Sequence, residues 1–238
     1  MPVNTQEHTS KRYDAELETA RSRVLQMGGL VEAQIAAAIE ALTTGNLALA
    51  EQVVRDDHRV NALEVQIDED CAHIIARRQP AAQDLRMIMT IVKMITDLER
   101  IGDEAEKIGR MTKLIYASER LMLPRFTEVK NAAACAIDML KKSLDSFARL
   151  DLANAAAVVK QDRALDDQFR GILRHLITFM MEDPRTISTS IEILFVAKAL
   201  ERIGDHAKNM SEYVVFLVKG KDVRHVTVEE FERETASD

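Results

Sequence analysis

The chain carries the same six residues, Leu-Glu-Arg-Ile-Gly-Asp, at 98–103 and again at 200–205. Each copy places a glutamate four residues before an aspartate, so the two carboxylates share one face of an α-helix. These acids are Glu99 and Asp103 in the first copy and Glu201 and Asp205 in the second. Apolar residues lead up to them in steps of three and four: Leu85, Ile88, Val92 and Ile95 in one copy, Ile187, Ile191 and Leu194 in the other. We therefore expect the acids to continue two core-facing stripes.

A second set of acids precedes each copy. The apolar residues Ala50, Val53 and Val54 lead to Asp57, Asn61, Glu64 and Asp68, and the apolar residues Ala155, Val158 and Val159 lead to Asp162 and Asp166. If the helices of one half pack together, acids spaced by four on one helix face acids spaced by four on the next. Asn61, Glu64 and Asp68 are weaker candidates, because Asp166, Phe169 and Leu173 take their places in the second half.

Such a group of carboxylates needs a neutralising partner. Two carboxylates ~6 Å apart repel each other by roughly 3 kcal/mol at an effective dielectric constant near 20. Protonation, arginines or a metal ion could relieve this repulsion, and an isolated acid pair of this spacing is usually a solvated helix face. The duplication favours metal. All-oxygen ligands suit divalent or trivalent ions of the Mg, Mn or Fe type, and several carboxylates can hold a multinuclear centre.

The elements that position these acids are expected to be helices. Of 238 residues, 47% are hydrophobic and 4% aromatic, with eight glycines, four prolines and no tryptophan, which favours an all-α fold. Pro80, Pro124 and Pro184 stand where long periodic segments should end. Six helices are predicted, over 11–44, 46–78, 81–117, 125–150, 152–182 and 185–219.

The two halves form an internal repeat. Val-Val-Arg-Asp-Asp-His at 53–58 resembles Val-Val-Lys-Gln-Asp-Arg at 158–163, a spacing close to that of the duplicated acid motif. We predict two tandem three-helix bundles related by a pseudo-twofold. The first spans 11–120 and the second 124–220. The charged C-terminal tail, 221–238, is expected to fray.

Composition also excludes some functions. A net charge of −7 argues against nucleic-acid binding. The first residues lack the apolar core of a signal peptide, and no stretch approaches the roughly 18 apolar residues of a membrane span, so we expect a cytoplasmic protein. No catalytic residue is identified: no histidine follows a glutamate by three residues, as di-iron helical bundles require, and His206 is expected at the surface.

The duplicated LERIGD motif, together with RRQPAAQDLR at 77–86 and MEDPRTI at 181–187, resembles the PhoU family over nearly the whole chain. The resemblance implies two three-helix bundles with iron, manganese or magnesium clusters held by acidic pairs. It also implies a signalling protein that links a phosphate ABC importer, with its ATPase, to a sensor histidine kinase. Such a protein negatively regulates the phosphate-starvation response and phosphate uptake. We further expect a homodimer that associates peripherally with inner-membrane complexes.

Carried over to this sequence, the metal-ligand positions are Asp57, Glu99, Asp103, Asp162, Asp166, Glu201 and Asp205, with Asn61, Glu64 and Asp68 as an additional metal site or polar seam. Asn61 departs from the acidic pattern, so the two clusters are expected to differ. Two hypotheses follow. The first is a non-enzymatic regulatory adapter. The alternative is a metal-dependent hydrolase or redox enzyme built on the carboxylate clusters.

Overall fold

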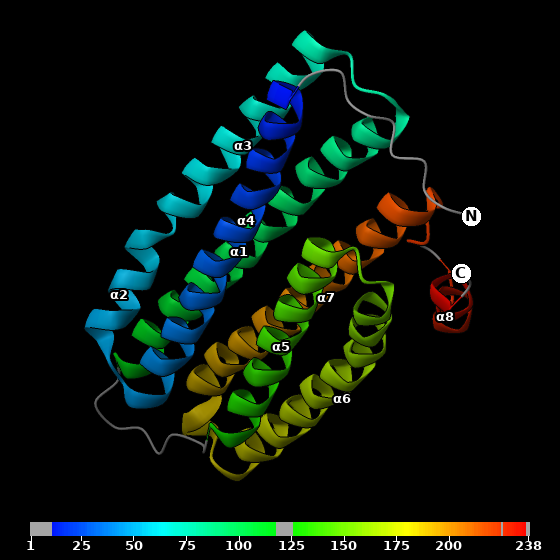
Figure 1. Ribbon diagram of the computed structural model, residues 1–238. Helices are drawn as coiled ribbons and strands as arrows, with labels where there is room; N and C mark the ends of the chain where they lie inside the picture. The colour runs from blue at the N-terminus through cyan, green and yellow to red at the C-terminus, as the bar shows by residue number, and fades with distance from the viewer. Residues whose placement is uncertain (1–10, 118–125, 225, 237–238) are drawn as a thin grey trace.

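The protein is an all-helical bundle (Figure 1). The computed structural model describes residues 11–117, 126–224 and 226–236, and these ranges contain no β-strand. The elements are α1 (Lys11–Thr44), α2 (Leu47–Asp56), α3 (His58–Arg78), α4 (Ala82–Tyr116), α5 (Thr127–Arg149), α6 (Leu152–Glu182), the 3-10 turn η1 (Pro184–Thr186), α7 (Ile187–Lys219) and α8 (Val228–Ala236). The prediction of an all-α fold is confirmed.

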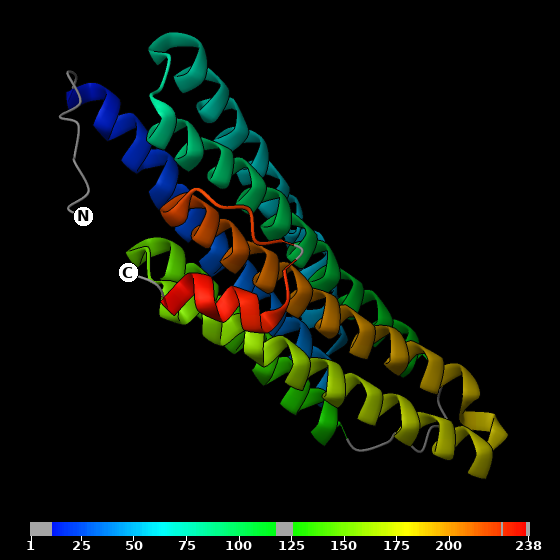
Figure 2. The same ribbon diagram turned by 90° about the vertical axis from the view of Figure 1, so that its right-hand side faces the viewer.

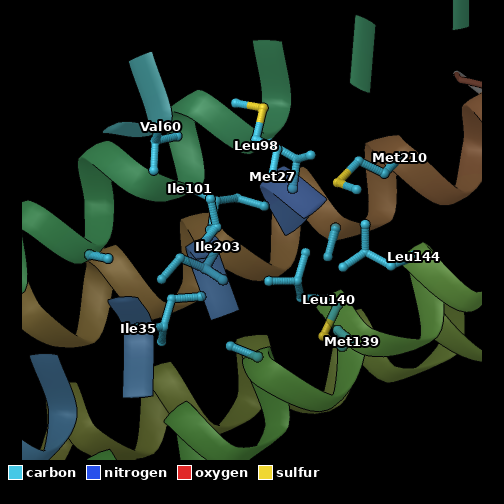
Figure 3. Packing of buried hydrophobic residues seen from close by; sticks show 14 of the residues in the cluster. Met27, Ile35, Val60, Leu98, Ile101, Met139, Leu140, Leu144, Ile203 and Met210 are labelled. Carbon is cyan, nitrogen blue, oxygen red and sulfur yellow. The ribbon is translucent and has the colours of Figure 1, made fainter. Parts of the chain in front are cut away.

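The helices form two bundles that lie side by side. Helices α1, α2, α3 and α4 make the first bundle, and α5, α6 and α7 make the second (Figure 1). Helix α4 packs along α7, and α1 packs against α5, so the bundles share a long interface (Figure 2). One core therefore runs through both. Figure 3 shows its centre, where Met27 and Ile35 of α1 meet Leu98, Ile101, Leu140, Ile203 and Met210.

The chain turns between helices where the sequence favours a helix end. Gly45 adopts a positive φ of 69°, and Asn46 then caps α2 by accepting a hydrogen bond from the Leu49 amide. Asp151 caps α6 in the same way, and Gly220 ends α7 with a φ of 72°. Pro184 begins the 3-10 turn before α7. The predicted bundle boundary near Pro124 lies outside the described residues.

The predicted helix over 46–78 is two helices that meet at Asp57. Asp57 keeps helical angles, with φ −57° and ψ −36°, so no turn-forming residue marks the break. Its carbonyl oxygen accepts from the Val60 amide at 2.9 Å, the tighter spacing of a 3-10 turn. This local change in winding places the Asp57 side chain, which is 7% exposed, inside the bundle.

The charged tail contains a helix where fraying was expected. Helix α8 begins at Val228 and packs on α6. Phe231 is 2% exposed and packs in a small cluster with Val223, Val159 and Val215. Charge dominates the composition of this segment, but its Val223 and Phe231 pack against the second bundle, and Glu229 forms an ion pair with Arg163 of α6.

Polar pairs cross the interface between α4 and α7. His206 was expected at the surface, but it is buried, and its Nδ1 lies 2.7 Å from a carboxylate oxygen of Asp97. Arg202 forms an ion pair with Glu104, which is also buried. The expectation for His206 failed because α7 is covered on two sides, by its own bundle and by α4. None of the described helices is long and apolar enough to span a membrane.

Candidate metal centre

The first acidic cluster gathers at the break between α2 and α3. Carboxylate oxygens of Asp57, Asp103 and Glu106 all lie within 4.8 Å of one another. Asp57 comes from the buried side of the break, while Asp103 and Glu106 come from successive turns of α4. The structure thus brings together Asp57 and Asp103, as the spacing predicted, and adds Glu106, which the sequence analysis did not select.

Burial and mutual repulsion both raise the pKa values of acids in this cluster. Partial burial raises the pKa of Glu99, and the charges of Asp103, Glu64 and Asp57 raise it further. Partial burial also raises the pKa of Asp103, with Asp57 and Glu106 adding to the shift. These carboxylates therefore act on one another as a single group of like charges.

The side chains that donate hydrogen bonds to Asp57 are neutral amides. Gln34 Nε2 of α1 donates to Asp57 Oδ1 at 2.9 Å, and Asn61 Nδ2 donates to Asp57 Oδ2 at 3.3 Å. Arg110 pairs with Glu106 on the solvent side. In the described part of the chain, no lysine or arginine forms an ion pair with Asp57 or Asp103. Arg110 acts on Asp103 and Asp57 through space but forms its ion pair with Glu106, so the inner part of the cluster has no directly bonded cation among the described residues.

The weaker candidates divide between the cluster and the solvent. Asn61 is exposed but bonds Asp57. Glu64 is half-buried, and its pKa is raised by burial, then by Asp68 and Asp103, so it belongs to the edge of the cluster. Asp68 is exposed, one turn farther along α3.

The acids lie at the edge of the core and not at its centre. Asp103 is exposed and Glu99 is half-buried, and Leu85, which begins the expected stripe, is 41% exposed. In α7, Ile187 and Ile191 are likewise exposed. The expectation of core-facing stripes therefore holds for Ile88 and Ile95, which are buried, and fails at the first residues of each stripe. These carboxylates lie at the border between the core and the solvent, where they can reach both one another and water.

The second acidic cluster occupies the matching place in the other bundle. Burial raises the pKa of Asp205 to about 6, and the charges of Glu201 and Asp162 contribute. Burial raises the pKa of Asp166 as well, again with Asp162 and Glu201. All four predicted acids of this half therefore lie near one another.

Two lysines bond these acids directly. Lys208 Nζ lies 2.7 Å from Asp162 Oδ2, and Lys198 Nζ lies 2.6 Å from Glu201 Oε1. Neither lysine was selected from the sequence, nor was Gln34. Comparing the two repeats position by position could have found Lys208, because Glu106 and Lys208 stand 102 residues apart, the same spacing as the LERIGD copies.

The first cluster fits a metal ion on the chemistry of its donors. It offers at least three carboxylates with oxygens close enough to share one ion, and it leaves a buried acceptor, Gln34 Oε1, without a hydrogen-bond partner among the described residues. Gly102 leaves room beside them: a Cβ at this position would lie 3.2 Å from Asp57 Oδ1. Oxygen donors of this kind suit hard ions such as Mg²⁺ or Mn²⁺.

The fold and the duplicated acids define a class of all-helical proteins made of two similar three-helix bundles, each with carboxylates where its second and third helices meet. Comparison with known proteins agrees with this class. The sequence model of the PhoU domain matches residues 24–112 and 129–214. The chain therefore belongs to the PhoU family.

Relatives match almost end to end. A Burkholderia protein named "Phosphate-specific transport system accessory protein PhoU homolog" is 46% identical over 228 residues, covering 95% of this chain and 97% of the relative. The Escherichia coli K12 protein "Phosphate-specific transport system accessory protein PhoU" is 42% identical over 231 residues, covering 97% and 95%. The crystal structure of PhoU from Pseudomonas aeruginosa superimposes with a TM-score of 0.84 at 44% identity, covering 88% of this chain and 100% of that one.

Proposed function

We propose that this protein is a regulatory accessory protein of a phosphate-specific transport system. In this proposal it couples the phosphate ABC importer to a sensor histidine kinase and holds the phosphate-starvation response off while phosphate is plentiful. Family membership carries the proposal, because relatives that bear the accessory-protein name align over nearly the whole chain. The protein would work at the inner membrane by docking on complexes that reside there, and as a homodimer.

Metal binding is the second part of the proposal. Asp57, Glu99, Asp103 and Glu106 would hold ions of the Fe, Mn or Mg type in the first bundle. Asp162, Asp166, Glu201 and Asp205 supply the same kind of donors in the second bundle, although lysines already bond two of them, Asp162 and Glu201. A bound cation supplies positive charge that offsets the mutual repulsion of these carboxylates and ties α4 to the break between α2 and α3.

A regulatory role is favoured over an enzymatic one by the names of the relatives, which describe accessory proteins. The alternative, a metal-dependent hydrolase or redox enzyme, predicts turnover by the metal-loaded protein. Assays over phosphoester and peroxide substrates test it, and turnover that disappears in Glu99→Gln would support the enzyme over the adapter.

Binding and gene expression test the regulatory proposal. The tagged protein should retain both the transporter ATPase and the sensor kinase from its own organism, and deletion of its gene should raise starvation-gene expression in high phosphate. Failure to bind either partner, combined with unchanged expression on deletion, would refute the proposal.

Two adjacent aspartates provide a test variant and a matched control for the proposed metal binding. Asp57 is buried in the cluster, whereas Asp56 lies outside it and bonds Gln52. Asp57→Asn should fail to restore repression in the deletion strain, while Asp56→Asn should restore it. Full repression by both variants would show that regulation does not need the first cluster.

A further inference from the structure

The two acidic clusters occupy equivalent positions in the repeat but differ in what surrounds them. Asp57 corresponds to Asp162, at a spacing of 105 residues in the second helix of each bundle, and Asp103 corresponds to Asp205 at a spacing of 102 in the third. Several positions around these acids change their chemistry between the halves. Three of them are Glu106 against Lys208, Thr96 against Lys198, and Gln34 against Met139. Asn61 against Asp166 and Arg110 against Glu212 also differ.

Gln34 and Met139 are structurally equivalent, because each lies against the glycine of the LERIGD motif in its own bundle. A Cβ on Gly102 would lie 3.4 Å from Gln34 Oε1, and a Cβ on Gly204 would lie 3.4 Å from Met139 Cε. Each side chain therefore reaches the equivalent glycine from the first helix of its own bundle. In the first bundle this position presents a polar oxygen, and in the second a thioether.

The second cluster contains its own cations. Lys208 comes from the turn of α7 after Asp205, and its ammonium group bonds Asp162, the buried acid of that cluster. Lys198 bonds both oxygens of Glu201 from one turn earlier. A hard metal ion could take these carboxylates only by displacing an ammonium group from each of them, and the displaced lysines would then repel the ion.

The first cluster has the opposite arrangement. Glu106 adds a carboxylate at the position of Lys208, and Thr96 bonds the Val92 carbonyl of its own helix instead of an acid. Arg110 forms its ion pair with Glu106 and acts on Asp103 and Asp57 only through space, so in the described part of the chain neither aspartate forms an ion pair with a cation.

Gln34 supplies an independent indication of a ligand. Its side chain is 8% exposed, and its amide nitrogen donates to Asp57, which aims the amide group into the cluster. Its Oε1 has no hydrogen-bond partner among the described residues. A buried acceptor without a partner is destabilising unless something satisfies it. A cation shared with Asp57 and Asp103 would do so.

We propose that the two clusters are not equivalent: the first, completed by Glu106 and Gln34, is the metal centre, whereas Lys198 and Lys208 hold the second together without metal. This inference rests on the proposed metal binding and assigns it to one half of the repeat. The second cluster then serves as an internal ion-pair network that joins α6 to α7.

Titration of the full-length protein with Mn²⁺ alone, after removal of metal by a chelator, tests the proposal. Free Mn²⁺ is read by electron paramagnetic resonance, and circular dichroism confirms that each variant is folded. Asp103→Asn should weaken Mn²⁺ binding at least about tenfold, and its equivalent Asp205→Asn should leave affinity and stoichiometry unchanged. Gln34→Leu should weaken binding several-fold while the protein stays helical.

Removing the lysines gives the reciprocal test. The double variant Lys198→Met, Lys208→Met should bind additional Mn²⁺ in the second bundle, and Asp205→Asn added to it should remove that increment. If Asp103→Asn and Asp205→Asn each remove half of the wild-type Mn²⁺, the inequivalence is wrong although metal binding stands. If the wild-type protein binds no Mn²⁺, the metal part of the proposed function fails as well.

Discussion

Replacing Asp103 by asparagine should change stability in opposite directions with and without metal. In the metal-free protein, Asp103 lies with Asp57 and Glu106 in a group whose carboxylate oxygens are within 4.8 Å. One pair at that distance repels by roughly 3 kcal/mol at an effective dielectric constant of 20, but Asp103 is exposed and water screens most of this. We expect Asp103→Asn to stabilise the metal-free protein by about 1 kcal/mol. Asparagine and aspartate have similar helix propensities, so the charge dominates the comparison.

Metal should reverse this order. An ion present at a hundred times its dissociation constant adds about 2.7 kcal/mol to the stability of a protein that binds it only when folded. The wild-type protein should gain this stability when Mn²⁺ is added, whereas Asp103→Asn should gain little of it. Urea unfolding followed by circular dichroism, in a chelator and then in Mn²⁺, measures both values. Asp167→Asn is the control, because Asp167 is an exposed acid that pairs with Arg170 outside both clusters.

Two results would refute this reasoning. If Asp103→Asn is less stable than wild type in the chelator, the carboxylates do not repel one another as their positions indicate. If both proteins gain equally from Mn²⁺, the ion binds elsewhere. The control should lie within about 0.5 kcal/mol of wild type under both conditions.

Three further predictions concern groups outside the first cluster. Burial raises the pKa of Glu212 from 4.5 to about 7, so its contribution to stability is complete below pH 4.5 and is lost as the pH rises through 7. Glu212→Gln should therefore reduce the difference in unfolding free energy between pH 5 and pH 8 by about 3 kcal/mol, measured by urea unfolding. An unchanged difference between the two pH values would contradict this prediction. His206→Ala leaves the buried Asp97 without its partner at 2.7 Å and should lower the free energy of unfolding by ~3 kcal/mol. A decrease below about 0.5 kcal/mol, the range of a surface substitution, would show that this pair does not stabilise the interface between α4 and α7. Phe231→Ala should release α8, seen as lost amide-exchange protection there with the bundles unchanged; retained protection in α8 would contradict its docking through Phe231.

Sequence periodicity predicted the helices well because their ends carry strong local signals. Gly45 with Asn46, Asp151, Pro184 and Gly220 all stand where a helix ends or begins, and each acts through its own backbone angles or side-chain oxygen. The break at Asp57 could not be predicted in this way, because Asp57 keeps helical angles and only the hydrogen-bond spacing changes.

The acid clusters were predictable in part. Four-residue spacing alone placed Asp103 with Glu99, and the repeat placed Asp57 near them. The buried face of α4 was harder to identify. Helix α4 is covered both by its own bundle and by α7, so its apolar surface is wide. No single stripe of residues therefore marks the centre of that surface. Leu85 was therefore expected inside and is exposed. Gln34 was missed because it comes from a different helix, and no spacing along the sequence links it to Asp57.

The most direct test of the metal centre is a crystal structure of the protein grown with Mn²⁺, with anomalous scattering recorded at a wavelength sensitive to manganese. We expect an anomalous peak within bonding distance of Asp57, Asp103 and Glu106, with Gln34 Oε1 turned toward it. Lys208 should still be bonded to Asp162 in the other bundle. A map with no peak among Asp57, Asp103 and Glu106, in a protein shown to be folded and saturated with Mn²⁺, would contradict it.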